Sequence, residues 1–91
     1  MDTYYQINRD YIVRVEFWGG LIINPTLNKE YVLDFTNVAF LKLIDLGLGV
    51  NEAIELLIKK GYKDKIYLDT FINLNILINK NEELCKDVDV N

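Results

Sequence analysis

The change from strand to helix falls within residues 31–47, which read YVLDFTNVAFLKLIDLG. Over Glu30–Phe35 apolar residues alternate between two faces, which is the period of a β-strand. From Thr36 onward they recur every three or four positions, which is the spacing of one helix face. Asp34 or Thr36 can cap that helix, because both side chains accept hydrogen bonds from free backbone N–H groups. This stretch predicts the last strand of a sheet followed directly by a first helix.

Two further strands are predicted upstream. Tyr11–Trp18 alternates between two faces and is rich in β-branched and aromatic residues, as strands are. Gly19–Gly20 then predicts a hairpin turn, because primed turns need positive φ. Leu21–Ile23 continues as a second strand, and a turn that begins at Asn24 leads to the third. Together they predict a three-stranded antiparallel meander, preceded by an N-terminal extension over residues 1–10.

Two further helices are predicted downstream. Val50–Lys60 carries one apolar face, and Gly61 follows it at the position where glycine ends many helices. Asp64 is expected to cap a third helix over Lys65–Asn79. Strands first and helices after predict an α+β domain over residues 11–79, similar in element order to a winged helix-turn-helix.

Composition limits the chemistry that the chain can perform. It has 91 residues, 51% of them hydrophobic, a net charge of −4 and a pI of about 4.6. His and Ser are absent, and the lone Cys85 lies in an acidic tail over residues 80–91, where we expect a short strand and a frayed end. This excludes an intrachain disulfide, a His/Cys zinc site and Ser/His or Cys/His catalytic pairs. We expect no enzyme activity, metal or cofactor, and the lone thiol without a signal sequence or apolar span indicates the cytoplasm.

Two features of the predicted fold offer a binding surface. The third helix has two apolar stripes, whereas a surface helix normally has one. One stripe contains Tyr67, Phe71, Leu74 and Ile78, and the other contains Leu68, Ile72 and Ile76. One stripe can pack on the core while the other binds a partner, or both can be core under the tail or in a homodimer. The third strand is an edge that can accept an extended peptide or can simply be blunted by Glu30 and Asp34.

A family resemblance is carried by residues 31–47 and by Val50–Tyr62, which reads VNEAIELLIKKGY. Both are similar in apolar spacing and polar markers to the PqqD-like family, the RiPP precursor-peptide recognition elements (RRE). Phe17–Ile22 resembles the strand and glycine turn of that family, and Leu68–Ile72 resembles its last helix. The resemblance extends over most of the chain.

The sequence departs from the family pattern at three positions. Asp34 replaces the usual Asn, Gly49 stands where a Ser or Thr cap is common, and Asn75 falls where Leu is frequent. Because Gly49 has no side chain, the second helix is expected to be weaker at its start by roughly a few tenths of a kcal/mol.

The resemblance implies a winged-helix fold that binds a peptide in place of DNA. In such domains the leader segment of a precursor peptide adds to the third strand and lies against the third helix. The implied peptide-binding residues are Glu30, Tyr31, Val32, Leu33, Asp34, Tyr67, Phe71, Leu74 and Ile78. The implied partners are the leader peptide and a separate maturation enzyme, often a radical S-adenosylmethionine (radical SAM) enzyme. The chain itself would be a non-enzymatic, chaperone-like adaptor.

Other functions are compatible with the sequence. An acidic winged helix can be a DNA-associated regulatory domain, although the cations of the third helix, Lys65 and Lys80, are confined to its ends. A plain protein–protein interaction domain or a homodimer is also open. An enzyme is disfavoured, because carboxylates such as Asp34, Asp45 and Glu52 have no predicted common pocket.

We expect no binding to duplex DNA above background at physiological salt. Two arginines, Arg9 and Arg14, and a net charge of −4 offer too few clustered cations to neutralise phosphates. The measurement is a mobility shift assay with a mixed-sequence duplex at about 0.05 M and about 0.2 M salt. A nanomolar complex that weakens steeply with salt would contradict this expectation.

Overall fold

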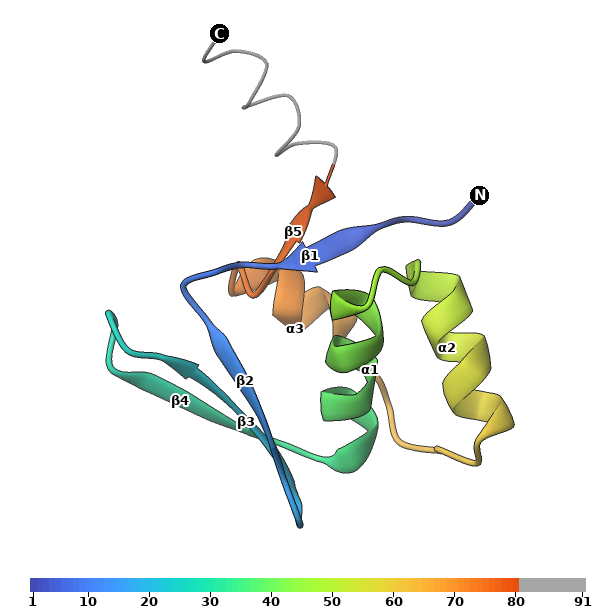
Figure 1. The fold of residues 1–91 in the computed structure, drawn as a ribbon, viewed down its shortest axis with the longest axis horizontal. Coiled ribbons are helices and arrows are strands. Elements are labelled where there is room, and N and C mark those ends of the chain that lie inside the picture. The colour runs from blue at the N-terminus through green and yellow to red at the C-terminus, as the bar shows by residue number, and fades with distance from the viewer. Residues whose placement is uncertain (81–91) are drawn as a thin grey trace, which may run out of the picture.

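The computed structural model describes residues 1–80, and the strand expected in the tail and Cys85 lie outside the described residues (Figure 1). No helix in the described part is long and apolar enough to cross a membrane. In chain order the elements are β1 (Tyr5–Ile7), β2 (Ile12–Glu16), β3 (Gly19–Asn24), β4 (Lys29–Leu33), α1 (Phe35–Asp45), α2 (Val50–Lys59), α3 (Leu68–Asn73) and β5 (Leu77–Asn79).

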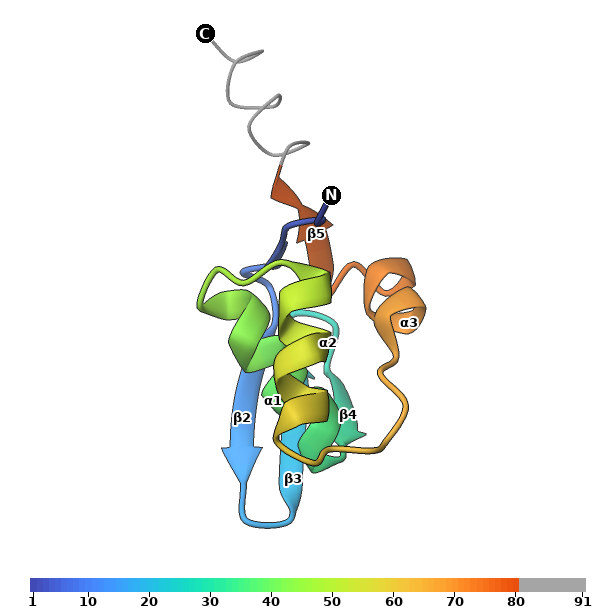
Figure 2. The ribbon, with the colours of Figure 1, turned by 90° about the vertical axis from the view of Figure 1, so that its right-hand side faces the viewer.

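Three strands form the predicted antiparallel meander, in the order β2-β3-β4. Helix α1 contacts all three strands from one face of this sheet, and α2 packs on the far side of α1 (Figures 1 and 2). This confirms the prediction of an α+β domain in which a three-stranded sheet precedes the helices. The core is made by the residues buried between these layers: Ile22, Leu33, Val38, Phe40, Leu41, Ile44, Val50, Ala53, Leu57, Phe71, Ile76 and Leu77.

The hairpin turn between β2 and β3 is not at Gly19–Gly20, so that prediction is wrong. The turn is formed by Phe17 and Trp18, and both glycines belong to β3. A Cβ on Gly20 would lie closer than 3.0 Å to the side chain of Val38, so α1 rests directly on the sheet backbone. A Cβ on Gly19 would come equally close to the carbonyl oxygen of Leu33. The glycine pair therefore allows close approach of α1 and β4 to β3.

The ends of α1 and α2 follow the predicted signals. Asp34 caps α1, because its carboxylate accepts a hydrogen bond from the backbone N–H of Asn37 at 2.8 Å. Gly61 follows α2 with a φ of +91°. The N–H of Tyr62 then donates to the carbonyl of Leu57 at 3.0 Å, which is the bond of a Schellman C-cap.

The third helix is much shorter than the predicted Lys65–Asn79. α3 ends at Asn73, and the chain turns at Asn75, whose φ is +59°. The N–H of Ile76 donates to the carbonyl of Phe71 at 2.9 Å, so this helix also ends in a Schellman motif. The helical spacing of apolar residues continues past this turn, so the sequence pattern does not reveal where the helix ends. Asparagine tolerates the left-handed conformation that ends it. The residues that follow the turn form β5.

The first ten residues are part of the fold, through strand β1 and through side chains on either side of it. β1 pairs antiparallel with β5 in a second, two-stranded sheet, so the two ends of the described chain lie together. The side-chain amide of Asn8 extends this pairing, because Nδ2 donates to the carbonyl of Asn75 at 2.8 Å.

Near the chain start, Asp2 caps α2 from a distant part of the sequence. Gly49 is the N-cap residue of α2 and has no side chain to contribute. The Asp2 carboxylate instead accepts hydrogen bonds from the N–H groups of Asn51 at 2.8 Å and Glu52 at 3.1 Å. A Cβ on Gly49 would lie closer than 3.0 Å to this carboxylate. Glycine at this position is therefore what leaves room for the distant cap.

We expect Asp2 to stabilise the fold only when it is ionised. The N–H of Asn51 lowers the pKa of the Asp2 carboxyl most, burial opposes the change, and the N–H groups of Glu52 and Thr3 lower the pKa further. Because the folded-state pKa lies below the ordinary value of 3.8, this stabilisation is present above that pH and is lost as the pH falls through the folded-state pKa. Asp2→Ala should therefore lower the melting temperature at neutral pH and have a smaller effect in strong acid.

Thermal unfolding followed by circular dichroism, at about pH 7 and about pH 2.5, measures this difference. Asp2→Asn is the matched control, because it keeps an acceptor oxygen but has no charge to lose. An Asp2→Ala effect of equal size at both pH values would contradict an ionic cap.

Candidate functional site

Strand β4 is an edge of the three-stranded sheet. Within residues 1–80 its only partner strand is β3, so its other side faces no strand. Leu33 points into the core, and the strand pleat therefore places Val32 on the opposite face, where it is 73% exposed. Glu30 lies on that same outer face and is also exposed.

The packing of Leu33 shows which backbone groups of β4 face the open side. Its carbonyl oxygen points toward β3, because it lies against Gly19 where a Cβ would otherwise be. The direction of N–H and C=O groups alternates along a strand, so Tyr31 also directs its groups to β3. The N–H and C=O groups of Glu30 and Val32 consequently point to the open edge. An extended peptide needs such a row of free donors and acceptors.

The opposite edge of the sheet, β2, is less accessible. Lys42 of α1 donates from Nζ to the carbonyl oxygen of Val13 at 3.2 Å, so a side chain already occupies this acceptor. Arg14 and Glu16 add an ion pair at 2.6 Å on the same strand. Charged side chains of this kind protect an edge from pairing with another strand. The two edges therefore differ, because a side chain occupies one outward acceptor of β2, whereas no side-chain hydrogen bond reaches the outward groups of Glu30 and Val32 in the described chain.

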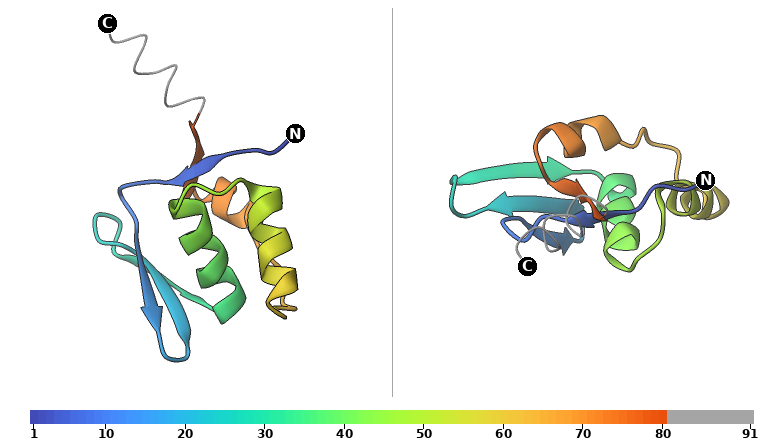
Figure 3. Two further views of the ribbon diagram at one scale, coloured as in Figure 1. Left: turned by 45° about the vertical axis from the view of Figure 1, so that its right-hand side comes forward. Right: turned by 90° about the horizontal axis from the view of Figure 1, so that it is seen from above.

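Helix α3 lies on the same side of the domain as β4, beyond the sheet edge that faces away from β3, and packs against β5 (Figures 2 and 3). The connection that leads to α3 is held to α1 by the fully buried amide of Asn37. Its Nδ2 donates to the carbonyl of Lys65 at 2.8 Å and to the carboxylate of Asp34 at 2.9 Å. Its Oδ1 accepts from the N–H of Tyr67 at 2.9 Å. The position of α3 relative to the edge thus depends on Asn37.

The residue predicted to cap the third helix has a different role. Asp64 accepts a hydrogen bond from the hydroxyl of Thr36 at 3.0 Å and so helps to attach the same connection to α1. The N-cap residue of α3 is Tyr67, which makes no side-chain cap bond. The capping prediction for Asp64 is therefore wrong, because the helix begins later than expected.

The five predicted site residues of β4 and its end divide between edge and interior. Tyr31 is half-buried against the core, and Leu33 is 9% exposed within it. Asp34 is exposed, but its carboxylate is engaged in capping α1. Glu30 and Val32 combine free backbone groups with exposed side chains, so they are the residues most available to a partner.

The four predicted residues of the third helix do not form a stripe. Phe71 is 2% exposed, and its ring stacks on Phe40 with 6.5 Å between centroids. Leu74 is half-buried at the turn after α3, and Ile78 belongs to β5. Tyr67, 45% exposed, precedes the helix and is the accessible member of the set. The stripe prediction is wrong because it extends the helical period beyond the end of α3.

The other stripe, predicted to be core, is also divided. Ile76 is buried, whereas Leu68 and Ile72 are half-buried. Sequence reasoning also missed Asn37 and Lys42, which position α3 and protect β2. A signal existed for the first of them, because asparagine is unfavourable inside helices and usually has a specific hydrogen-bond partner there.

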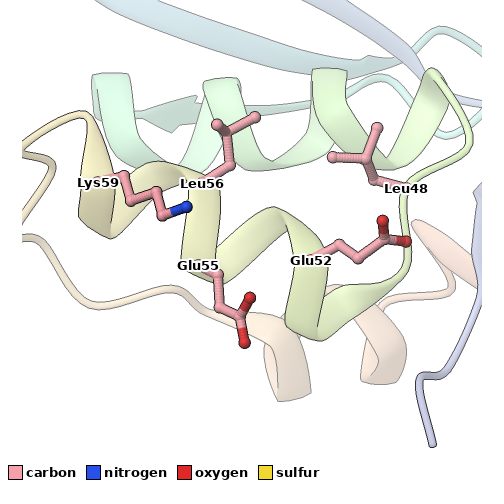
Figure 4. A pocket seen from close by; sticks show the side chains of 5 residues that line it. All are labelled: Leu48, Glu52, Glu55, Leu56 and Lys59. Atoms are coloured by element: carbon pink, nitrogen blue, oxygen red, sulfur yellow. The ribbon is translucent and has the colours of Figure 1, made fainter.

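Hollows in the described surface lie away from the β4 edge. The hollow in Figure 4, of about 270 Å³, lies along α2 and the α1–α2 connection and is lined by Leu48, Glu52, Glu55, Leu56 and Lys59. Another, of about 330 Å³, lies between Ile54 and residues 65–70. No group of His, Cys, Asp and Glu side chains within residues 1–80 is suited to hold a metal ion.

Comparison with known proteins finds no family model, no curated protein and no solved structure that matches the chain. The chain itself provides an open β4 edge, with α3 on the same side of the domain. Free backbone groups at Glu30 and Val32 are the chemical feature of this edge that a ligand can use.

We expect Phe71→Ala to destabilise the fold much more than Ile72→Ala. Phe71 is 2% exposed and packs on Phe40, so its truncation should remove about 3–5 kcal/mol of unfolding free energy. Ile72 is only half-buried and should cost about 1–2 kcal/mol. Urea unfolding followed by circular dichroism measures both values. A larger loss for Ile72→Ala would mean that α3 turns its other face to α1.

Proposed function

We propose that this chain is a non-enzymatic peptide-recognition adaptor of the cytoplasm. It binds the leader of a ribosomally synthesised precursor peptide and presents that peptide to a maturation enzyme. The leader adds as a further strand along β4, with α3 beside it. The observation that carries the proposal is the open edge at which Glu30 and Val32 direct their N–H and C=O groups away from β3.

Backbone pairing alone gives only a weak complex. Glu30 and Val32 supply up to four backbone hydrogen bonds, and about 0.5–1.5 kcal/mol for each gives a total of about 2–6 kcal/mol. Micromolar affinity requires about 8 kcal/mol. Apolar contacts must therefore contribute the remainder. The exposed side chains of Val32 and Tyr67 and the half-buried Leu21 and Ile23 are available for this.

The proposal includes a winged helix-turn-helix arrangement that serves peptide binding in place of DNA binding. The order of the β2-β3-β4 sheet followed by three helices supports it. α3 has six residues, and its exposed side chains are Asp69, Thr70 and Asn73. A major-groove reader needs a longer helix with cationic or amide side chains supported by cations around it. A peptide ligand is therefore favoured over DNA.

The maturation enzyme is proposed from the resemblance of residues 31–47 and Val50–Tyr62 to the PqqD-like recognition elements. Partners of such domains are often radical SAM enzymes. The absence of His and Ser from the sequence supports a division of labour in which a separate enzyme performs the modification chemistry.

Val32→Pro is the sharpest test of strand addition. It removes the N–H that faces the open edge, while the sheet itself makes no use of that group. Val32→Thr is the control, because threonine is also β-branched and keeps the N–H. The probes are synthetic peptides that cover the first half of each short reading frame beside this gene. Titrations are followed by amide chemical shifts, and thermal unfolding confirms that both variants are folded.

We expect one such peptide to shift the amides of residues 30–34 in the unaltered chain and in Val32→Thr. In Val32→Pro its affinity should fall about tenfold or more, which corresponds to at least one lost hydrogen bond. Equal affinity for the proline and threonine variants, or shifts confined to residues away from β4, would exclude this edge as the binding site.

A further inference from the structure

Resting on the proposed function, we infer that the bound strand carries a lysine or arginine opposite Glu30 and a β-branched apolar residue opposite Val32. The two residues are separated by one position, whose side chain points to the other face of the sheet. This names the chemistry of the segment that the β4 edge selects, in addition to the backbone pairing that any extended peptide can make.

The register of the sheet defines the surface that an added strand would continue. On the outer face, Arg14, Leu21 and Val32 lie in one row across the three strands. Ile12, Ile23 and Glu30 lie in the next row. An added strand extends each row by one side chain, placed directly opposite Val32 or Glu30.

Apolar surface favours a β-branched residue beside Val32. Val32 is 73% exposed, although its neighbour in the row, Leu21, is half-buried. Within residues 1–80 no helix or strand covers the outer face, so an incoming side chain is what would remove Val32 from water (Figures 1 and 3). β-Branched side chains pack well against each other across neighbouring strands.

Charge favours a cation beside Glu30. The other charged side chains of the outer face, Arg14 and Glu16, already pair with each other at 2.6 Å. The Asp34 carboxylate is occupied by its bonds to Asn37. Among the described residues Glu30 has no ion-pair partner, and Lys29 next to it projects from the other face. On the outer face of this edge, Glu30 is thus the charged side chain without an ion-pair partner in the described chain.

Antiparallel pairing of β4 with β4 of a second copy does not provide this complement. Antiparallel pairing of β4 with itself can place Glu30 opposite Glu30, or Val32 opposite Val32 with Glu30 opposite Asp34. Both arrangements bring like charges together, which is unfavourable. A third arrangement, Glu30 opposite Val32, leaves both Glu30 carboxylates without a cation. A basic peptide places a cation opposite the Glu30 carboxylate, which these homodimer arrangements do not.

The test uses a displayed library of random nine-residue peptides, selected on the full chain and on two variants. Glu30→Lys reverses the charge at the edge. Glu55→Lys changes the net charge by the same amount at an exposed position of α2, away from β4 (Figure 4). Selected peptides are then synthesised with Lys or Glu at the basic position, and their affinities are measured for each chain at low and high salt.

We expect the unaltered chain and Glu55→Lys to select Lys or Arg two positions from Val or Ile. Both should bind the Lys peptide roughly three- to tenfold more tightly than the Glu peptide, and this preference should shrink at about 1 M salt. Glu30→Lys should reverse the preference. A preference that Glu55→Lys reduces as much as Glu30→Lys does would reflect net charge and would overturn the inference.

Val32→Pro distinguishes failure of this inference from failure of the proposed function. Selected peptides without a basic residue that still bind Val32→Thr and lose affinity for Val32→Pro would overturn the inferred side chains but leave strand addition standing. Selected peptides that bind Val32→Pro and Val32→Thr equally, or no enrichment on the unaltered chain, would contradict both. Self-association that Glu30→Lys abolishes would show that a second copy is the partner and would also overturn the inference.

Discussion

The buried amide of Asn37 joins the parts of the fold that form the candidate site. It lies in the first turn of α1, directly after β4, and reaches the backbone of Lys65 and Tyr67 before α3. An amide without access to water is unfavourable unless its donors and acceptor are paired, and here all of them are. Because its partners include main-chain atoms, the amide fixes the course of the backbone in addition to filling space in the interior. The place of α3 beside the sheet follows from it.

The two edges of the sheet determine where further strands can add to it. β2 has its Val13 carbonyl occupied by Lys42, whereas β4 keeps the backbone groups of Glu30 and Val32 without a strand partner in the described chain. A sheet with one protected edge and one open edge accepts a strand on one side only. That asymmetry suits a one-to-one complex, while Glu30 discourages continued stacking of the same strand. In the proposed function, peptide recognition and resistance to aggregation thus both depend on the Glu30 side chain.

Local sequence is sufficient for the elements whose signals are local. Alternation predicts β2 and β4, and helical spacing with the Asp34 cap predicts α1. It fails at Gly19–Gly20, because the need for glycine there comes from α1 and β4, which are distant in sequence. It fails again at Asn75, where a helix stop lies inside an apolar spacing that is compatible with helix. For the site, element order predicts an open edge strand, but the direction of its backbone groups depends on tertiary contacts that no local pattern contains.

The cap on α2 has an evolutionary consequence. Serine at position 49 would cap the helix by itself, but its Cβ would collide with the Asp2 carboxylate, which lies within 3.0 Å of that point. A local cap and the distant cap therefore compete for the same space, and residues 2 and 49 are expected to co-vary. A side chain gained at position 49 has to displace the Asp2 carboxylate, which is the mobile end of its side chain, so it exchanges the distant cap for a local one. The space beside one glycine thus decides which residue caps α2.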